Sequence, residues 1–319
     1  MIRRYPLISF FVLAFVFSWW PWPLDVLGLA PSPLIGFGPF LAAVVVLASA
    51  GGRAAVLALL HRMVRWRVPP LWYAVALVLP LVLAASATLL NVLLGAGTPT
   101  RGQLLTWPAL VPTFFLLLLV PGIGGAWEEP GWRGFAQPKL QVSYSALAAS
   151  LVLGVIWAVW HVPLMIKGTI PFTDLIFVVA STVVFTWLLN NTAGSVLLAM
   201  LMHTMNNVVA GGFFTPMFSG ADRTRQGWLI AAVWCAAAIG IVIASGSAHL
   251  SRTNRRQMLA PSGGRPGRAV TPAPTDVGVT RPSRRSTGPA MRRTLLRRLE
   301  DVSAAVRPRP QRSYPRRHT

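Results

Sequence analysis

Apolar stretches of about 20 residues recur through the first 250 residues of this chain, and they limit its fold more than any other feature. A helix of about 20 residues crosses the ~30 Å hydrocarbon core of a bilayer. The sequence places eight such helices at Pro6–Leu27, Pro31–Ala50, Leu71–Leu94, Trp107–Ala126, Tyr144–Ile166, Phe172–Leu189, Ser195–Phe214 and Trp228–Ser245. The first has no small-residue cleavage site, so it is interpreted as a retained span rather than a signal peptide. The chain is therefore predicted to be an all-α, polytopic membrane helix bundle.

Charge divides the chain into two parts. Only 12% of the residues are charged, about half of what soluble domains carry. Residues 1–250 hold 12 Lys or Arg against five acids, whereas residues 251–319 hold 17 Arg against three acids and are rich in Pro, Gly, Ser and Thr. We expect 1–250 to form the bundle and 251–319 to be a disordered cytoplasmic tail. The tail suits anionic lipid, whereas nucleic-acid binding rests on charge alone, because the tail contains no folded reading module.

Basic residues also predict the orientation. With eight spans, one side of the membrane receives the N-terminus with Arg3 and Arg4, the connection with Arg53, Arg62, Arg65 and Arg67, the connection with Arg133 and Lys139, and the tail. By the positive-inside rule, this multi-pass protein of the cell membrane has both termini in the cytoplasm. The stretch Arg53–Val68 mixes apolar and basic residues and is interpreted as an amphipathic helix on the cytoplasmic lipid surface.

A few ionisable or strongly polar residues lie inside the apolar spans or at their ends. They are Glu128, Glu129 and Arg133 after the fourth, His161 late in the fifth, and His203, Asn206 and Asn207 in the seventh. A charged residue at the centre of a membrane helix costs about 2.5–3.5 kcal/mol on insertion scales, so such residues indicate function by default. We therefore expect them to form one common site. The single cysteine, Cys235, excludes an intramolecular disulfide and a Cys-based metal cluster.

Two uses of this site fit the residue types. Glu and His can remove a proton from water, while a second His and an Asn one helical turn apart can donate to an oxyanion. The same Glu and His side chains are also suitable zinc ligands with one position left for water. A proton or cation path would use similar residues, although no inverted repeat of the transporter kind is evident. The residues alone leave hydrolysis, zinc binding and transport open.

Three motifs, in this order along the chain, resemble the motifs of a known family. Glu128-Glu129-Pro-Gly-Trp-Arg133-Gly-Phe135, Trp157-Ala-Val-Trp-His161 and His203-Thr-Met-Asn-Asn207 resemble those of the family of CAAX proteases and bacteriocin-processing enzymes. They fall within about 107–210, the expected protease-like core. Trp157 stands where Phe is common in the family. The resemblance does not extend to the tail.

The resemblance implies an intramembrane endopeptidase of metallo- or glutamic type that acts on a membrane-associated or lipidated protein. It implies that Glu128 activates water with help from His161, and that His203 and Asn207 hold the oxyanion. In the metal alternative, Glu128, His161 and His203 would bind Zn²⁺. Glu129 and Arg133 would polarise the site. A degenerate member acting as a scaffold or immunity protein is disfavoured by the intact motifs.

One geometric condition follows from the predicted spans. Glu128 lies at the cytoplasmic end of its span, and His161 lies 17 residues into the next one, a rise of about 25 Å at 1.5 Å per residue. For the two side chains to meet, the fourth helix must continue past Pro130 toward Gln137, or the fifth must begin outside the hydrocarbon.

Overall fold

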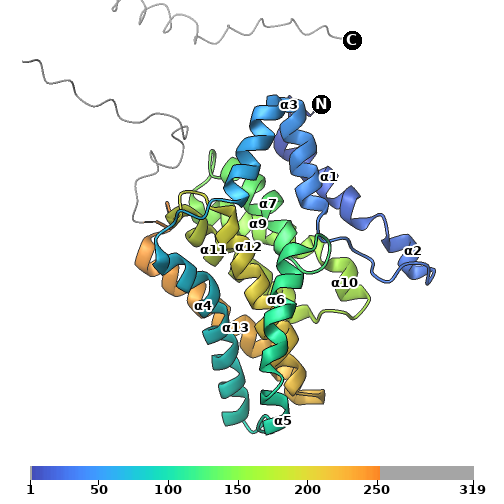
Figure 1. Ribbon diagram of the computed structural model, residues 1–319, viewed down its shortest axis with the longest axis vertical. Helices are drawn as coiled ribbons and strands as arrows, with labels where there is room; N and C mark the ends of the chain where they lie inside the picture. The colour runs from blue at the N-terminus through green and yellow to red at the C-terminus, as the bar shows by residue number, and fades with distance from the viewer. Residues whose placement is uncertain (1, 252–319) are drawn as a thin grey trace, which may run out of the picture. The chain divides into compact units, whose positions relative to one another are not determined.

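Long apolar helices make up most of the computed structural model, which describes residues 2–251 (Figure 1). Seven helical segments are long and apolar enough to cross a membrane: Pro6–Val26, Gly38–Met63, Pro70–Leu93, Arg101–Leu119, Phe172–Asn191, Val196–Met217 and Gly220–Ser245. The shorter apolar helix Ala146–Trp160 lies within the remaining predicted span. The described residues contain no β-strand. The predicted membrane helix bundle is thereby confirmed, whereas the predicted tail lies outside the described residues.

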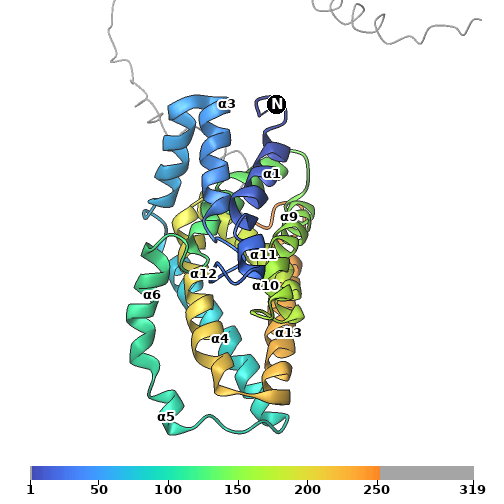
Figure 2. The same ribbon diagram turned by 90° about the vertical axis from the view of Figure 1, so that its right-hand side faces the viewer.

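The N-terminal part consists of α1 (Pro6–Trp19), α2 (Trp22–Val26) and α3 (Gly38–Met63). Gly52 has φ +65° and interrupts α3, a conformation that glycine adopts without steric cost. The two limbs of α3 consequently lie side by side and meet at the bend (Figure 2). The second limb is helical from Arg53 to Met63, within the predicted surface helix Arg53–Val68. Leu59 and Met63 on it are buried in the protein, and its contact with lipid stays a prediction.

The predicted helix Trp107–Ala126 is shorter than expected. Helix α4 (Pro70–Leu93) is followed by α5 (Arg101–Leu104), η1 (Trp107–Ala109) and α6 (Leu110–Leu119). Val120 is extended, and Gly122 and Gly124 have φ of +86° and +77°, which ends α6 before the acidic pair. Helical backbone then resumes in η2 (Ala126–Glu128), α7 (Glu129–Gly131), the π-helix η3 (Trp132–Ala136) and α8 (Gln137–Leu140). The break thus precedes Pro130, so the fourth helix does not continue to Gln137 as one predicted solution required. A separate helical path carries the chain past Pro130 instead.

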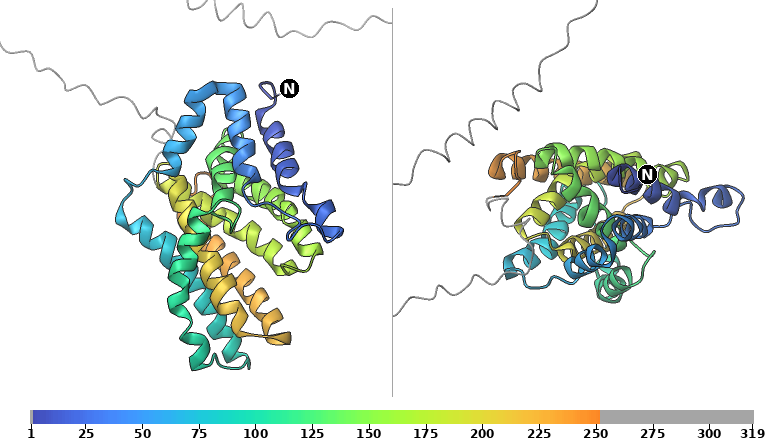
Figure 3. Two further views of the ribbon diagram at one scale, coloured as in Figure 1. Left: turned by 45° about the vertical axis from the view of Figure 1, so that its right-hand side comes forward. Right: turned by 90° about the horizontal axis from the view of Figure 1, so that it is seen from above.

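The C-terminal half contributes α9 (Ala146–Trp160), α10 (Val162–Ile166), α11 (Phe172–Asn191), α12 (Val196–Asn206), the π-helix η4 (Asn207–Phe214), η5 (Thr215–Met217) and α13 (Gly220–Ser245). Helix α11 packs against both α9 and α13, and α12 packs against α4. A Cβ on Gly154 would lie 3.0 Å from the backbone of Val179, so this glycine lets α9 and α11 approach closely. The views in Figure 3 show α12 near the middle of the bundle, surrounded by the other helices.

Candidate active site

Glu128 and Glu129 form the acidic pair. They lie on the short helical path made by η2, α7, η3 and α8, which follows the break after α6. A Cβ on Gly131 would lie 2.4 Å from the carbonyl oxygen of Pro39, and one on Gly134 would lie 2.5 Å from a methyl carbon of Leu59. These two glycines of the first motif therefore allow both limbs of α3 to pack directly against the path. The path is fully enclosed, with Glu129 and Arg133 completely buried.

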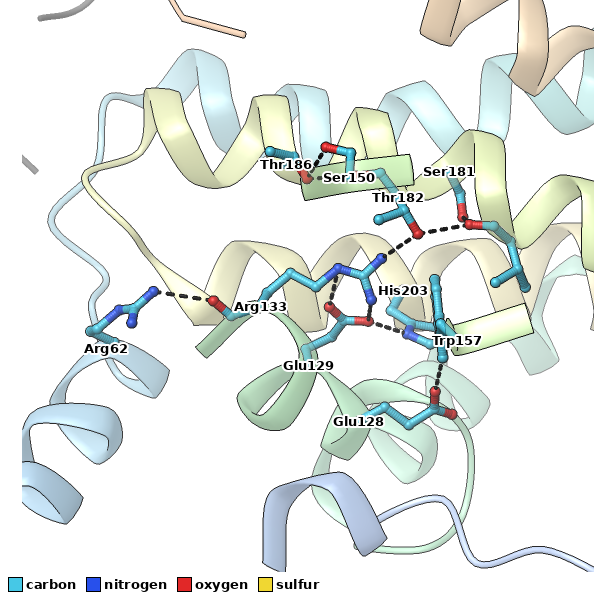
Figure 4. A network of polar contacts seen from close by, with 11 residues as sticks. Arg62, Glu128, Glu129, Arg133, Ser150, Trp157, Ser181, Thr182, Thr186 and His203 are labelled. Atoms are coloured by element: carbon cyan, nitrogen blue, oxygen red, sulfur yellow. Dashed lines mark hydrogen bonds and ion pairs between the residues drawn. The ribbon is translucent and has the colours of Figure 1, made fainter. Parts of the chain in front are cut away.

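Glu129 is the centre of a buried polar network (Figure 4). Its Oε1 lies 2.6 Å from Nδ1 of His203, and the Arg133 guanidinium lies 3.3 Å from each of its two oxygens. Arg133 also donates to Thr182 Oγ1 at 3.3 Å, and its guanidinium carbon lies 4.1 Å from the centre of the Trp157 ring. Because a buried ion pair adds little net stability, its value here is to fix the position of His203.

Glu128 occupies a different environment from its neighbour. Its side chain points away from Arg133, and its Oε2 accepts a hydrogen bond of 2.7 Å from the Trp157 indole N–H. Burial raises the pKa of this carboxyl to about 7, although the charge of His203 and the Trp157 hydrogen bond oppose the rise. A carboxylate with a pKa near neutrality is suited to general-base catalysis.

His161 follows the last residue of α9 and is tied to the same tryptophan. Its Nδ1 lies 2.8 Å from the carbonyl oxygen of Trp157, and the two rings are 5.5 Å apart. A carbonyl oxygen only accepts, so Nδ1 carries the proton and Nε2 keeps a free lone pair. Trp157 therefore contacts Glu128 through its side chain and His161 through its backbone. Glu128 and His161, which the predicted spans placed at different depths, therefore both contact Trp157.

His203 lies on α12, with its ring 5.6 Å from that of Trp157. A Cβ on Gly125 would lie 1.9 Å from Nε2 of His203, so the ring occupies the space that the missing side chain leaves. The absence of a side chain at Gly125 thus lets α12 bring His203 next to the segment that carries Glu128.

Asn207 lies at the point where α12 ends and η4 begins, and its side chain is half-buried. Within residues 2–251 its side chain forms no hydrogen bond. The structure therefore brings together Glu128, Glu129, Arg133, His161 and His203, whereas no described hydrogen bond joins Asn207 to them.

The donors do not form a ready metal site. Within the described residues, no group of three or more His, Cys, Asp or Glu side chains is arranged to hold a metal ion. Glu129 contacts Nδ1 of His203, and the Trp157 carbonyl contacts Nδ1 of His161, so Nε2 of each ring is the nitrogen left for a metal. The zinc site stays a prediction.

Several residues of the network were not predicted from the sequence. In its motif Trp157 stands where Phe is common, which indicates only a bulky aromatic ring, whereas its indole N–H donates a hydrogen bond to Glu128. Thr182 and Phe185 of α11 contact the Arg133 guanidinium through a hydroxyl group and a ring face. Isolated Thr and Phe residues on an apolar span carry no sequence signal of such a role.

Comparison with known proteins identifies the domain that carries these residues. Residues 107–209 match the family model described as type II CAAX prenyl endopeptidase, Rce1-like. This segment is similar to the CAAX protease family. CAAX prenyl protease 2 of Methanococcus maripaludis is 30% identical over 110 residues, which cover 31% of this chain and 39% of that relative. The chain therefore matches about two fifths of the relative's length, and the six predicted site residues all lie within the matched segment.

Proposed function

We propose that this protein is a membrane endopeptidase that cleaves a prenylated or otherwise lipidated membrane-associated protein. The observation that carries the proposal is the pair of contacts made by Trp157, which donates its indole N–H to Glu128 and whose carbonyl bonds the His161 ring. Similarity to the CAAX protease family and the name of the relative support the reaction class.

The proposed first step is attack of water on the scissile carbonyl. Glu128, in its carboxylate form, takes a proton from the water as the oxygen bonds to the carbonyl carbon, and the free Nε2 of His161 accepts the other water hydrogen as a hydrogen bond. His203 keeps its Nδ1–H on Glu129, and in its imidazolium form the Nε2–H donates to the oxyanion. The Glu128 carboxyl then passes its proton to the departing amine nitrogen, which breaks the peptide bond and restores the carboxylate.

Glu129 and Arg133 take part by positioning. Their mutual contacts and the Thr182 hydroxyl fix the carboxylate that holds His203. Asn207 remains a proposed second oxyanion donor. The described network supplies His203 alone, so substrate binding would have to bring Asn207 into contact. Both termini are proposed to lie in the cytoplasm, on the basis of the basic residues that flank the spans.

The proposal is tested with purified protein in proteoliposomes and a farnesylated peptide that ends in a CAAX sequence. Mass spectrometry identifies the cleavage point, which we expect to lie directly after the lipidated cysteine, with release of the last three residues. The variants Glu128→Gln and His203→Ala should lose this product. The matched control Asp222→Asn changes an acid outside the site and should keep it. Equal product from Glu128→Gln and wild type would exclude the assignment.

A further inference from the structure

Arg62, in the last turn of α3, donates hydrogen bonds to three backbone carbonyls on two other segments. Its Nη1 lies 2.7 Å from the carbonyl oxygen of Gly134, its Nη2 lies 3.3 Å from that of Arg133, and its Nε lies 2.8 Å from that of Gly194. Among the ion pairs of residues 2–251, none includes Arg62. Figure 4 shows the contact between the Arg62 guanidinium and the backbone carbonyl oxygen of Arg133.

We propose that Arg62 is a positioning residue for the active site, a role that rests on the proposed peptidase function. It ties the backbone of the segment that carries Glu129 and Arg133 to the turn that begins α12, the helix that carries His203. The contact between Glu129 and His203 then depends on a cation that touches neither of them.

The carbonyls of Arg133 and Gly134 face a residue that has no N–H. Gln137 N–H bonds to the carbonyl of Trp132, five residues back, as the π-helix requires. In this register the carbonyl of Arg133 faces residue 138, and in the α-helical register the carbonyl of Gly134 faces the same residue. Residue 138 is proline, which has no N–H. Arg62 supplies donors at the two carbonyls that Pro138 leaves without one in these registers.

The third carbonyl belongs to a strained turn between α11 and α12. Ala193 has φ +51° and Gly194 has φ +75°, so the chain reverses here through two left-handed residues. Next to this turn, the Ser195 hydroxyl donates to the carbonyl of Arg65 at 2.9 Å. Two contacts therefore hold the start of α12, one from Arg62 in the last turn of α3 and one from Arg65, which follows α3.

The guanidinium group suits this task better than an ammonium group. Its donors are fixed in one plane and can reach acceptors on separate segments at once, whereas the lysine ammonium is a compact charge on a flexible stem. Arg62→Lys should therefore keep the positive charge but lose the tie between the two segments. If the positive charge at Arg62 served only membrane orientation, Arg62→Lys would keep that function.

The test measures cleavage kinetics and thermal unfolding of the full-length protein in detergent for Arg62→Gln and Arg62→Lys. Arg53→Gln is the matched control, since Arg53 is an exposed arginine on the same limb of α3. We expect kcat to fall at least tenfold in both Arg62 variants, with KM within twofold of wild type and Arg53→Gln unchanged. Wild-type kcat in Arg62→Lys, or a loss of rate no larger than the loss of folded protein, would overturn the proposal.

A second variant tests the reason given for the contact. Pro138→Ala restores a backbone N–H next to the same carbonyls, so Arg62→Gln should lower the unfolding temperature less in the Pro138→Ala background than in wild type. Equal losses in both backgrounds would show that Arg62 does not supply the missing donor. This comparison needs no substrate. A wild type that cleaves nothing would refute the proposed function, whereas an active wild type with equal losses refutes the Arg62 account.

Discussion

The Trp157→Phe substitution isolates the hydrogen bond between the Trp157 indole and Glu128. Phenylalanine keeps a ring beside the Arg133 guanidinium, which lies 4.1 Å from the centre of the Trp157 ring, but it removes the N–H that lies 2.7 Å from Glu128 Oε2. The carbonyl that His161 uses belongs to the backbone and is retained. The variant should therefore alter the base and leave the rest of the network in place.

The size of the effect follows from the charge of the acceptor. A hydrogen bond to a charged group contributes about 1.5–3 kcal/mol, and about 1.36 kcal/mol corresponds to one pKa unit. Burial raises the pKa of Glu128 to about 7, and the Trp157 hydrogen bond opposes that rise. Without this bond the pKa should increase further, by about one to two units.

The sign of the pH effect is determined by the role of the base. Glu128 must be deprotonated to act, so cleavage should increase as the pH rises through its pKa. In Trp157→Phe the acid limb of the plot of kcat/KM against pH should move to higher pH by at least about one unit, with recovery above the new pKa. Trp127→Phe is the control, because the Trp127 indole donates to the carbonyl of Leu118 instead. An acid limb that stays in place in an active Trp157→Phe enzyme would refute this reasoning.

Three further predictions concern the same site. Burial raises the pKa of Glu128 from 4.5 to about 7. The free energy of unfolding should therefore fall as the pH rises through this window, by about 3 kcal/mol at most. Glu128→Gln should unfold at a higher temperature than wild type at pH 8, with a smaller difference at pH 5. Gly125→Ala should reduce kcat at least tenfold, since the new Cβ would lie 1.9 Å from Nε2 of His203. Circular dichroism checks that the variant is folded. A kcat equal to that of wild type would contradict the placement of the ring. Because the proposed mechanism activates water through Glu128 without a metal, incubation with a chelator should leave the cleavage rate unchanged. Loss of activity that zinc restores would favour the metal alternative.

The membrane bundle could be predicted because length and hydropathy act over whole helices. Each of the eight predicted spans overlaps a helix of the structure, but some ends differ widely. The predicted span Pro31–Ala50 corresponds to α3, which runs from Gly38 to Met63. The fourth span ends early, because α6 ends at Leu119. Glycines at 122 and 124 adopt positive φ there, which an apolar pattern does not record.

The sequence predicted which residues form the site better than it predicted their contacts. Intramembrane charge and motif spacing identified Glu128, Glu129, Arg133, His161 and His203, because unpaired polar groups are costly in a membrane. The role of Trp157 was missed, since an aromatic residue in a motif indicates bulk and its N–H adds no separate signal. Arg62 was interpreted through the positive-inside rule, which treats an arginine as a topological signal. Its three carbonyl acceptors come from segments far away in the sequence.

The most direct test of the account compares kcat/KM of wild type, Glu128→Gln and Asp222→Asn on the farnesylated CAAX peptide at pH 8. General-base catalysis contributes a factor of about 10²–10⁴, so Glu128→Gln should lose at least about 100-fold while Asp222→Asn stays within twofold of wild type. A Glu128→Gln enzyme that cleaves the peptide at the wild-type rate would contradict the central claim that Glu128 activates the water.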